Sequence, residues 1–491
     1  MIQASSLELR QHKKLVTVWS ITFLILFPVL ITFGLLMRMK QGEVLNIGHD
    51  TFYALMTLHG LGMAGVLFSI AWAALFYLIG TRYARLNIKV GYFIYFLVLI
   101  GTVELVIASL IGKFGAGWYL LYPLPFKGAN WASWATGLSI IALIVLGVAW
   151  LIGSLHVVYA LSNKYGSFYK LMGWNYLGKK EPEQKLPSIV LITTASLVPA
   201  ILSFLAGAVF LVMNLMQQFE PTLAFDPLLL KNLVFFFGHT LVNVTMYLGV
   251  AWVYALLPEY TKREWGVNKV VVLSWNGTFI FIMFAYFHHL YMDFAQPLGL
   301  HYAGQLASYF SAIPATVVTM FGVIVQFYHS KMKWSIIPMT FLIGMAGWAI
   351  GGFAAVVDST ISINKILHNT LWVPAHFHTY MLLGIVLFIF GFLFYLAYCN
   401  SEERNDPKPG FGFWTFVVGA FGFVLMFYLG GMNSVPRRYS DYVAIESGSV
   451  HHTGALLAKI AAVFVGIILI GLFTMYGSLF VKLLKPSKAN S

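Results

Sequence analysis

Charged residues are scarce in this chain. Only 10% of its 491 residues are Asp, Glu, Lys or Arg, whereas 59% are hydrophobic. A soluble domain carries about 25% charged residues, so this chain lacks the polar groups needed to cover a water-exposed surface. The composition therefore excludes an ordinary soluble protein and indicates an integral membrane protein.

Cysteine is almost absent. The single cysteine, Cys399, cannot form an internal disulfide and cannot supply a thiolate metal cluster. The Cys-x-x-Cys-His motif that attaches heme covalently is absent as well.

Acidic residues are outnumbered by basic ones, 17 to 30, which gives a net charge of +13. The basic residues gather at the N-terminus, in alternate loops and in the C-terminal tail: Arg10, Lys13, Lys14, Arg82, Arg85, Lys89, Lys164, Lys170, Lys179, Lys180, Lys185, Lys262, Arg263, Lys331, Lys333, Lys482, Lys485 and Lys488. By the positive-inside rule, this distribution places both termini in the cytoplasm. The charge therefore reports membrane topology and lipid contact, and we expect no nucleic-acid partner.

Long apolar runs dominate the rest of the sequence. Runs of roughly 20 apolar residues, the length that crosses a bilayer, predict about twelve transmembrane helices. They lie near 15–38, 51–80, 91–112, 132–160, 187–216, 229–258, 269–292, 303–328, 335–356, 370–398, 411–432 and 455–482. We expect an all-α integral membrane bundle that forms a single domain over residues 1–491. Its expected location is the cytoplasmic (inner) membrane of a prokaryote.

Six histidines stand inside these apolar segments: His59, His239, His288, His289, His376 and His378. An imidazole in hydrocarbon is costly, so an intramembrane histidine marks a functional site. Imidazole is also a common protein ligand for heme iron and copper. The sequence therefore predicts metals bound within the membrane. The alternative is a multi-helix transporter or channel whose histidines relay protons, and that alternative predicts no heme.

His376 and His378 are two residues apart in an apolar segment. On a helix this spacing separates the two imidazoles by about 200°, so they point to opposite sides. One helix could then ligate two cofactors, with Phe377 between them. Two axial imidazoles from different helices are typical of a low-spin, electron-transferring heme. His59 together with one of this pair fits such a heme.

His288 and His289 are adjacent, at the end of a predicted helix. Neighbouring helical residues diverge by about 100°, so both can reach one metal only near a helix end. His239 would complete a site with three nitrogen ligands. Three neutral imidazoles leave an open position and suit copper, with zinc as the alternative metal. The other interpretation of the adjacent pair is a polar group at the membrane surface.

Taken together, these segments resemble subunit I of the heme-copper oxidoreductase superfamily, and most closely its B-type branch. The resemblance runs from His59 to Arg438 and rests on five ordered motifs. They are Thr57-Leu-His-Gly, Phe225-Asp-Pro-Leu with the following Phe-Phe-Gly-His239, Phe287-His-His, His368-Asn-Thr-Leu-Trp-Val-Pro-Ala-His-Phe-His378 and Val435-Pro-Arg-Arg-Tyr439.

The resemblance implies a role for each histidine. His59 and His378 would be the axial ligands of a low-spin heme, and His376 would be the proximal ligand of a high-spin heme. The remaining three would hold copper opposite that second heme: His239, His288 and His289. The resemblance leaves the chemical type of both hemes open.

The same resemblance assigns polar residues to the outer side. Arg437 and Arg438 would bind heme propionates, a task that suits the permanent charge and bidentate fork of arginine. His368 and Asn369 would lie near the propionates, where family members hold a structural divalent cation. Two further polar residues on outer loops are expected to be structural: Asp358 and His301.

One position departs from the pattern of the oxygen-reducing members. In A- and B-type oxidases, a tyrosine that can be cross-linked to the imidazole follows the copper-ligating histidine by four residues. This chain has Asn243 there. An amide can form hydrogen bonds, but it can neither donate an oxidising equivalent nor act as an acid. Nitric oxide reductases likewise lack tyrosine at this position and carry glutamate.

The positions of a cytoplasmic proton pathway depart as well. Four residues after Pro314, where oxidases place a lysine or threonine, this chain has Val318. A channel tyrosine of B-type oxidases is replaced by Val250, although Tyr254 matches another, and the A-type glutamate is replaced by Leu241. We therefore expect the cytoplasmic proton pathway to be interrupted.

These departures favour a nitric oxide reductase on a B-type scaffold, which would turn two NO molecules into N2O at the high-spin heme and copper. The predicted catalytic residues are His376, His239, Asn243 and Tyr291. Protons would come from the outer side without pumping, and Asp293 is a candidate acid near the copper. Glu104 is a buried acid without an assigned role. The alternative is a proton-translocating oxygen reductase in which Tyr291 or Tyr247 replaces the missing phenol.

The resemblance also implies partners. We expect a small second subunit whose soluble domain carries a dinuclear copper centre or a heme and passes electrons to this chain. The donor would be cytochrome c or a quinol, and membrane lipids would surround the bundle.

Overall fold

The part of the chain that the structure describes is helical. A computed structural model describes residues 5–126, 130–179, 182–398, 406–443, 445 and 448–484, and Cys399 lies outside them. Within these residues there is no strand. One isolated antiparallel bridge joins Thr370 to Pro436.

The first half of the fold contains these elements: α1 (Ser6–Gln41), α2 (His49–Arg82), α3 (Ile88–Val106), the π-helix η1 (Ile107–Ile111), α4 (Ser133–Tyr165), α5 (Phe168–Leu171), the 3-10 helix η2 (Trp174–Leu177), α6 (Ser188–Phe219) and α7 (Pro227–Thr261). The second half contains α8 (Lys269–Ala285), the 3-10 helix η3 (Tyr286–Leu290), α9 (Leu298–Phe327), α10 (Ile336–Ser359), α11 (Ile361–Leu367), α12 (Trp372–Tyr380), the π-helix η4 (Met381–Ile385), α13 (Val386–Tyr398), α14 (Phe411–Met432) and α15 (Gly448–Leu484).

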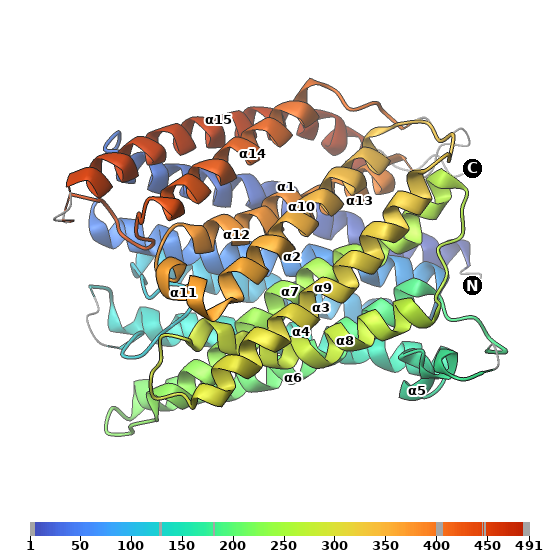
Figure 1. The fold of residues 1–491 in the computed structure, drawn as a ribbon, viewed down its shortest axis with the longest axis horizontal. Coiled ribbons are helices and arrows are strands. Elements are labelled where there is room, and N and C mark those ends of the chain that lie inside the picture. The colour runs from blue at the N-terminus through green and yellow to red at the C-terminus, as the bar shows by residue number, and fades with distance from the viewer. Residues whose placement is uncertain are drawn as a thin grey trace.

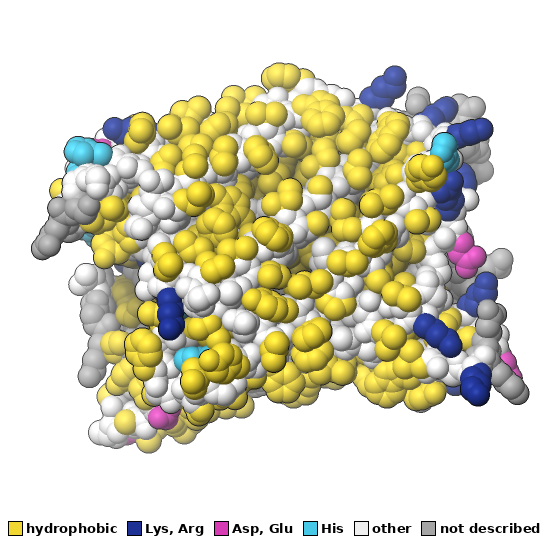
Figure 2. Space-filling view, viewed as in Figure 1, with side chains coloured by type: hydrophobic (Ala, Val, Ile, Leu, Met, Phe, Trp, Pro, Cys, Tyr) yellow, Lys and Arg dark blue, Asp and Glu magenta, His cyan; other side chains and the backbone are white. Residues whose placement is uncertain are grey.

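Twelve helical spans within the described ranges are long and apolar enough to cross a membrane. The long helices lie side by side, and both chain ends lie at the same end of the bundle (Figure 1). Apolar side chains cover the face seen in Figure 2, and most of its lysines and arginines gather at the end that holds the termini. The predicted all-α membrane bundle is confirmed, and the chain is a multi-pass membrane protein.

Three spans form the centre of the bundle and carry four of the six histidines. Their most apolar windows are the most buried: 89% in the span Trp372–Tyr398, 83% in α7 and 72% in α2. The start of α7 follows from its sequence. The Asp226 carboxylate accepts a hydrogen bond from the Leu229 amide (2.7 Å), and Pro227 occupies the first turn, where its missing N–H costs nothing.

The tenth predicted span is not one regular helix. Just after His378 it passes through the π-helix η4, between α12 and α13. Gly347 and Gly344 of α10 face this turn, and a side chain at Gly347 would collide with the backbone of Leu383. Isolated π-turns inside α-helices are frequent at functional sites, and this one directly follows the histidine pair.

Candidate functional site

Three histidines meet inside the bundle. His239 comes from α7, and His288 and His289 come from η3. One nitrogen of each lies within 4.8 Å of the other two, and His239 Nδ1 is 3.3 Å from His289 Nε2. Among the described residues, no other group of three His, Cys, Asp or Glu side chains comes this close. The spacing and the donor atoms suit one transition-metal ion.

The adjacent pair reaches one point because the helix changes there. Helix α8 ends at Ala285, and the chain tightens into η3, which presents both imidazoles with ring centroids 4.2 Å apart. This is the helix-end geometry that the sequence required. His288 Nδ1 interacts with the Ser308 hydroxyl (2.9 Å), which leaves Nε2 for a metal. Outer partners of this kind orient metal-binding imidazoles.

His376 and His378 point away from each other, as their spacing predicts. His376 Nδ1 donates to the Gly351 carbonyl (3.0 Å), whereas His378 Nδ1 donates to the Pro374 carbonyl (2.7 Å). A carbonyl can only accept, so both Nδ1 atoms carry the proton and both Nε2 atoms keep a lone pair. Each Nε2 is therefore able to bind a metal.

His59 faces His378 from α2. Its Nδ1 donates to the Leu30 carbonyl of α1 (2.7 Å), and the two rings lie 6.3 Å apart at 21°. Two metal–nitrogen bonds of about 2 Å plus the radius of each ring fill roughly that separation. The pair therefore fits the two axial positions of one heme.

Glycines let helices and loops approach closely around His59. A side chain at Gly34 would stand 3.2 Å from the His59 ring, so this glycine makes room for the imidazole. Gly62 instead faces Leu30 of α1, and Gly60 faces Trp118. Gly62 therefore allows α1 and α2 to pack closely against each other.

Backbone hydrogen bonds hold Arg437 and Arg438 beside the segment His368-Asn-Thr370. The Arg437 amide donates to the Asn369 carbonyl (2.9 Å), and the Leu371 amide donates to the Val435 carbonyl (2.9 Å). Arg438 stacks over the Tyr119 ring at 3.8 Å. Neither guanidinium has a carboxylate within 4.0 Å among the described residues, and Arg437 Nε is buried without a hydrogen-bond partner there.

Two such cations need an anion. Burial, and then the neighbouring Arg438 charge, lower the pKa of Arg437 to about 9. A buried charge that has lost its hydration is stabilised when a carboxylate or another anion binds it. The two guanidiniums therefore fit the propionates of a heme held by the histidines.

His368 lies in the same outer region. Its Nδ1 is 3.0 Å from the Asn364 side-chain oxygen. Burial, followed by the charges of Arg437 and Arg438, lowers the pKa of His368 to about 4, so the imidazole is neutral at pH 7. His368 belongs to no cluster of three His, Cys, Asp or Glu ligands among the described residues. A divalent cation beside it stays a prediction.

Asn243 lies one turn after His239 on α7. Its Nδ2 is 3.3 Å from His239 Nε2 and donates to the His239 carbonyl (2.9 Å). On its other side, the Tyr380 hydroxyl donates to Asn243 Oδ1 (3.3 Å). Sequence reasoning missed Tyr380. Its position four residues after His376 was the available signal, because that spacing shares a helix face.

The other predicted polar residues lie around this centre. The Tyr291 hydroxyl donates to the Ser359 carbonyl (2.9 Å), and its ring packs 5.5 Å from His301. Asp293 pairs with Lys231 at 2.6 Å, and Asp358 accepts from Asn364 through its carbonyl (2.7 Å). None of these contacts places a side chain on the three histidines.

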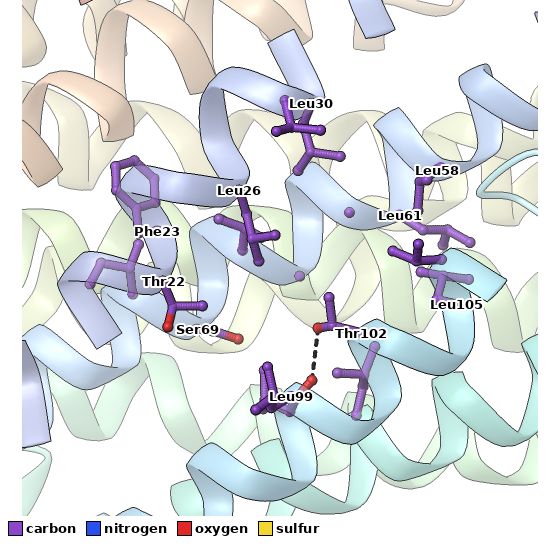
Figure 3. Close-up of a pocket in the computed structure, with 18 of the residues that line it drawn as sticks. Thr22, Phe23, Leu26, Leu30, Leu58, Leu61, Ser69, Leu99, Thr102 and Leu105 are labelled. Carbon is purple, nitrogen blue, oxygen red and sulfur yellow. Dashed lines mark hydrogen bonds between the residues drawn. The ribbon is translucent and has the colours of Figure 1, made fainter. Parts of the chain in front are cut away.

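A cavity of about 230 Å³ lies elsewhere, between α1, α2 and α3 (Figure 3), with Leu146 of α4 at its edge. Its wall includes Leu30 and Leu58, which flank the His59 region, and is almost wholly apolar. The hydroxyl of Thr102 in the wall is bonded to the Val98 carbonyl (2.7 Å), whereas Trp19 Nε1 is buried without a hydrogen-bond partner among the described residues. This cavity offers no chemistry of its own. The carboxyl oxygen Oε2 of Glu104, nearby on α3, is buried without a hydrogen-bond partner in the described part of the chain.

The fold and the site define a membrane protein whose central helices carry imidazoles that are placed to ligate metals. Residues 14–475 match the family model described as Cytochrome C and Quinol oxidase polypeptide I. The chain belongs to this family, subunit I of the heme-copper oxidases. It is an oxidoreductase of that family, whose members bind hemes and copper.

The named relatives have low sequence identity to this chain but match it over most of its length. The chain is 26% identical over 421 residues to cytochrome c oxidase subunit 1 of Cereibacter sphaeroides, covering 79% of this chain and 69% of the relative. It is 25% identical over 506 residues to the alternative cytochrome c oxidase subunit 1 of Bradyrhizobium diazoefficiens, covering 96% and 82%. A heme-copper terminal oxidase dimer solved by cryo-EM has the same fold, with a TM-score of 0.78, 20% identity and coverage of 98% and 85%.

Proposed function

We propose that this chain is the catalytic subunit of a respiratory nitric oxide reductase. The observation that carries the proposal is Asn243, whose amide lies against the imidazole of His239 (3.3 Å) where oxygen-reducing relatives are expected to carry a tyrosine. Reduction of two NO to N2O and water consumes two electrons and two protons. It breaks no O–O bond and therefore needs no oxidisable phenol at this position.

Each group of histidines has its own proposed role. His59 and His378 would hold the heme that receives electrons, and His376 would hold the second heme. The three-histidine cluster would hold copper, with Asn243 beside it. When bound, the second heme and the copper supply the electrons and the binding positions for NO.

Protons are proposed to arrive from the outer side. The polar groups around the propionate region are numerous there: Lys231, Asp293, Asn364, His368, Arg437 and Arg438. Asp293 is ion-paired with Lys231 at 2.6 Å, which holds its carboxylate in place among these polar groups. On the inner side, Val250 interrupts the polar positions of α7.

Oxygen reduction is the second candidate, and two observations favour it. The relatives that match carry cytochrome c oxidase names, which fit oxygen reduction better than NO reduction. The Tyr380 phenol also stands 3.3 Å from Asn243 Oδ1, so the site has a phenol that comes from another helix. Tyr291 is less suited, because its hydroxyl is engaged by the Ser359 carbonyl (2.9 Å).

Product analysis separates the two candidates. The purified complex would be given NO under anaerobic conditions with a chemical reductant, and N2O would be quantified against electrons consumed. In parallel, O2 uptake would be measured with the same reductant. The proposal predicts one N2O per two electrons and slow O2 uptake. Oxygen turnover faster than NO turnover, with water as product, would reject it.

The remaining proposals concern the surroundings. We propose a second subunit with a soluble electron-entry domain, carrying dinuclear copper or heme, supplied by cytochrome c or a quinol. We also propose the cytoplasmic membrane of a prokaryote as the location. Copurification of a metal-containing partner with the native complex tests the first of these.

A further inference from the structure

A tyrosine in the connection between α3 and α4 stacks on the second arginine of the pair. The guanidinium carbon of Arg438 lies 3.8 Å from the centre of the Tyr119 ring. A planar guanidinium comes this close by lying face to face with the ring. Stacking uses the face of the guanidinium and leaves the N–H groups on its edge free to donate. Arg438 can therefore keep its contact with Tyr119 and bind a carboxylate at the same time.

The backbone of Arg438 has an uncommon conformation. Its φ angle is +70°, a left-handed value that residues with a side chain rarely adopt. The Tyr53 hydroxyl of α2 donates to the Arg438 carbonyl (3.2 Å), and the Arg437 amide donates to the Asn369 carbonyl (2.9 Å). These bonds fix the point where the Arg438 side chain begins. The direction of its guanidinium then depends on what the side chain itself contacts.

The charge of Arg438 needs a partner. Burial lowers the pKa of Arg438, because the guanidinium has lost part of its hydration. Among the described residues, no carboxylate lies within 4.0 Å of this guanidinium. The face of an aromatic ring carries the negative part of its quadrupole and attracts a cation. The ring of Tyr119 is therefore a favourable neighbour for this charge.

The loop that carries Tyr119 is fixed to α2. The Gly117 amide donates to the Thr57 hydroxyl (2.8 Å), and Thr57 is fully buried. Gly117 has a φ angle of +76°, and a Cβ there would lie 2.8 Å from atoms of the Tyr119 ring. Only glycine combines this backbone conformation with so close a ring. The loop therefore leaves the Tyr119 ring little room to move.

Trp118 packs the same loop against two histidine-bearing helices. A Cβ at Gly60 of α2 or at Gly238 of α7 would lie 3.3 Å from the Trp118 side chain. Gly60 directly follows His59, and Gly238 directly precedes His239. The ring that follows Trp118 in the chain is thus held in a fixed place relative to both helices.

We propose that Tyr119 is a positioning residue for heme binding, acting through a cation–π contact that holds the Arg438 guanidinium and leaves its N–H edge for a propionate. The proposal rests on the assignment of Arg437 and Arg438 to heme propionates. It does not depend on whether NO or O2 is the substrate.

The test varies the electrons of the ring at position 119 in the whole purified complex. Tyr119→Phe keeps the ring and should have heme midpoint potentials close to those of wild type. Phenylalanines with one, two or three fluorine atoms keep nearly the same shape while they progressively weaken the negative face of the ring. Each added fluorine should lower a heme midpoint potential further, because the positive charge of Arg438 is held less firmly near the propionate. A purely structural role of the ring would produce no such graded shift.

Heme retention gives a second readout. Tyr119→Leu removes the ring and should speed the transfer of heme to a competing heme-binding protein by about 3- to 10-fold, the factor expected for one lost cation–π contact. The double variant with Arg438→Met should lose heme no faster than Arg438→Met alone, since both changes act through one contact. Tyr302→Leu is the control, because Tyr302 is an exposed tyrosine of α9 that stacks on no arginine of the described residues.

The outcomes are distinct. Midpoint potentials in the fluorinated series that equal those of Tyr119→Phe would overturn the proposal, and this series decides the question if Tyr119→Leu fails to assemble. Additive effects of Tyr119→Leu and Arg438→Met would overturn it as well. Wild-type complex without heme would instead overturn the propionate assignment, and this inference with it. A rejection of NO reduction by product analysis would leave these expectations unchanged.

Discussion

The imidazoles of His59 and His378 lie nearly parallel, 6.3 Å apart at 21°, although 319 positions separate them in the chain numbering. Each Nδ1 is held 2.7 Å from a backbone carbonyl, Leu30 for one and Pro374 for the other. Both Nε2 atoms therefore keep a lone pair that can bind a metal. Such a pair is typical of a heme that transfers electrons and keeps no open position for substrate.

Removing either ring should remove this heme. We expect His59→Ala and His378→Ala each to yield one heme per complex instead of two, with loss of the low-spin optical bands and retention of copper. Pyridine hemochrome quantification and metal analysis measure both. His156→Ala is the control, because its Nε2 only accepts from the Asn87 amide (3.0 Å) at the other end of α2. Two hemes in both ligand variants would contradict the pairing.

The three-histidine cluster makes a separate prediction. His239→Ala should reduce bound copper to less than a tenth of wild type, because two imidazoles hold a transition metal far more weakly than three. The low-spin heme spectrum should be unchanged, since His59 and His378 are untouched. Metal analysis and reduced-minus-oxidised spectra check this. Normal copper content, or unchanged turnover of NO, would remove His239 from the site.

The charge of Arg437 should destabilise the heme-free protein and stabilise the heme-loaded protein. Burial and Arg438 lower its pKa to about 9, so its charge destabilises the heme-free fold. Replacing it with Met should stabilise heme-free protein by about 1–3 kcal/mol, as for other buried charges replaced by apolar groups. The same change should weaken heme retention and lower the heme midpoint potential, because a positive charge near the propionates is lost.

Thermal unfolding of heme-depleted and of heme-loaded protein measures the change in stability that Arg437→Met causes in each form. Arg437→Lys is the comparison, since it keeps the charge but loses the bidentate fork. The lysine variant should keep a heme midpoint potential close to that of wild type and lose part of the heme affinity. A destabilised heme-free protein in Arg437→Met would indicate that a partner carboxylate already pairs with this arginine.

The sequence predicted the fold because each membrane-spanning helix appears in it as a long apolar run. It also predicted that His376 and His378 diverge and that His288 and His289 sit at a helix end, because both follow from residues per turn. It did not predict η4, since a π-turn leaves no compositional mark, and it treated 370–398 as one helix.

Contacts between distant segments were the harder part. Tyr380 meets Asn243 across 137 positions, and no local pattern reports such a pair. The ion pair of Asp293 with Lys231 and the contact of Tyr291 with Ser359 were missed for the same reason. The heme type and the electron donor depend on groups outside this chain, and its residues carry no trace of them.

Gly351 should tolerate no side chain. A Cβ there would lie 3.1 Å from the Tyr380 Cα, and the Gly351 carbonyl accepts the hydrogen bond from His376 (3.0 Å). Gly351→Ala should therefore push α10 from α12, destabilise the protein by about 1–3 kcal/mol and loosen the second heme. Gly137→Ala in α4 is the control, because nothing lies within 4 Å of its Cβ position.

The control should be neutral or slightly stabilising, since Ala is a better helix former than Gly by about 1 kcal/mol. Thermal midpoints of the two purified variants, measured at equal detergent and protein concentration, decide the comparison. Equal thermal midpoints would show that α10 and α12 can move apart without a loss of stability.

The inner half of α7 tests the origin of the protons. Tyr254 bonds to the Thr319 hydroxyl at 2.9 Å, but the next hydroxyl toward the site on that helix face belongs to Tyr247, seven residues or about 10 Å along the axis. Val250 occupies the interval, and a proton cannot cross it without ordered water. Tyr254→Phe and Thr319→Val should therefore leave NO reduction within twofold of wild type. In sealed vesicles, protons consumed during NO reduction should disappear from the outer side. A tenfold loss of turnover in either variant, or uptake from the inner side, would place the proton supply on α7.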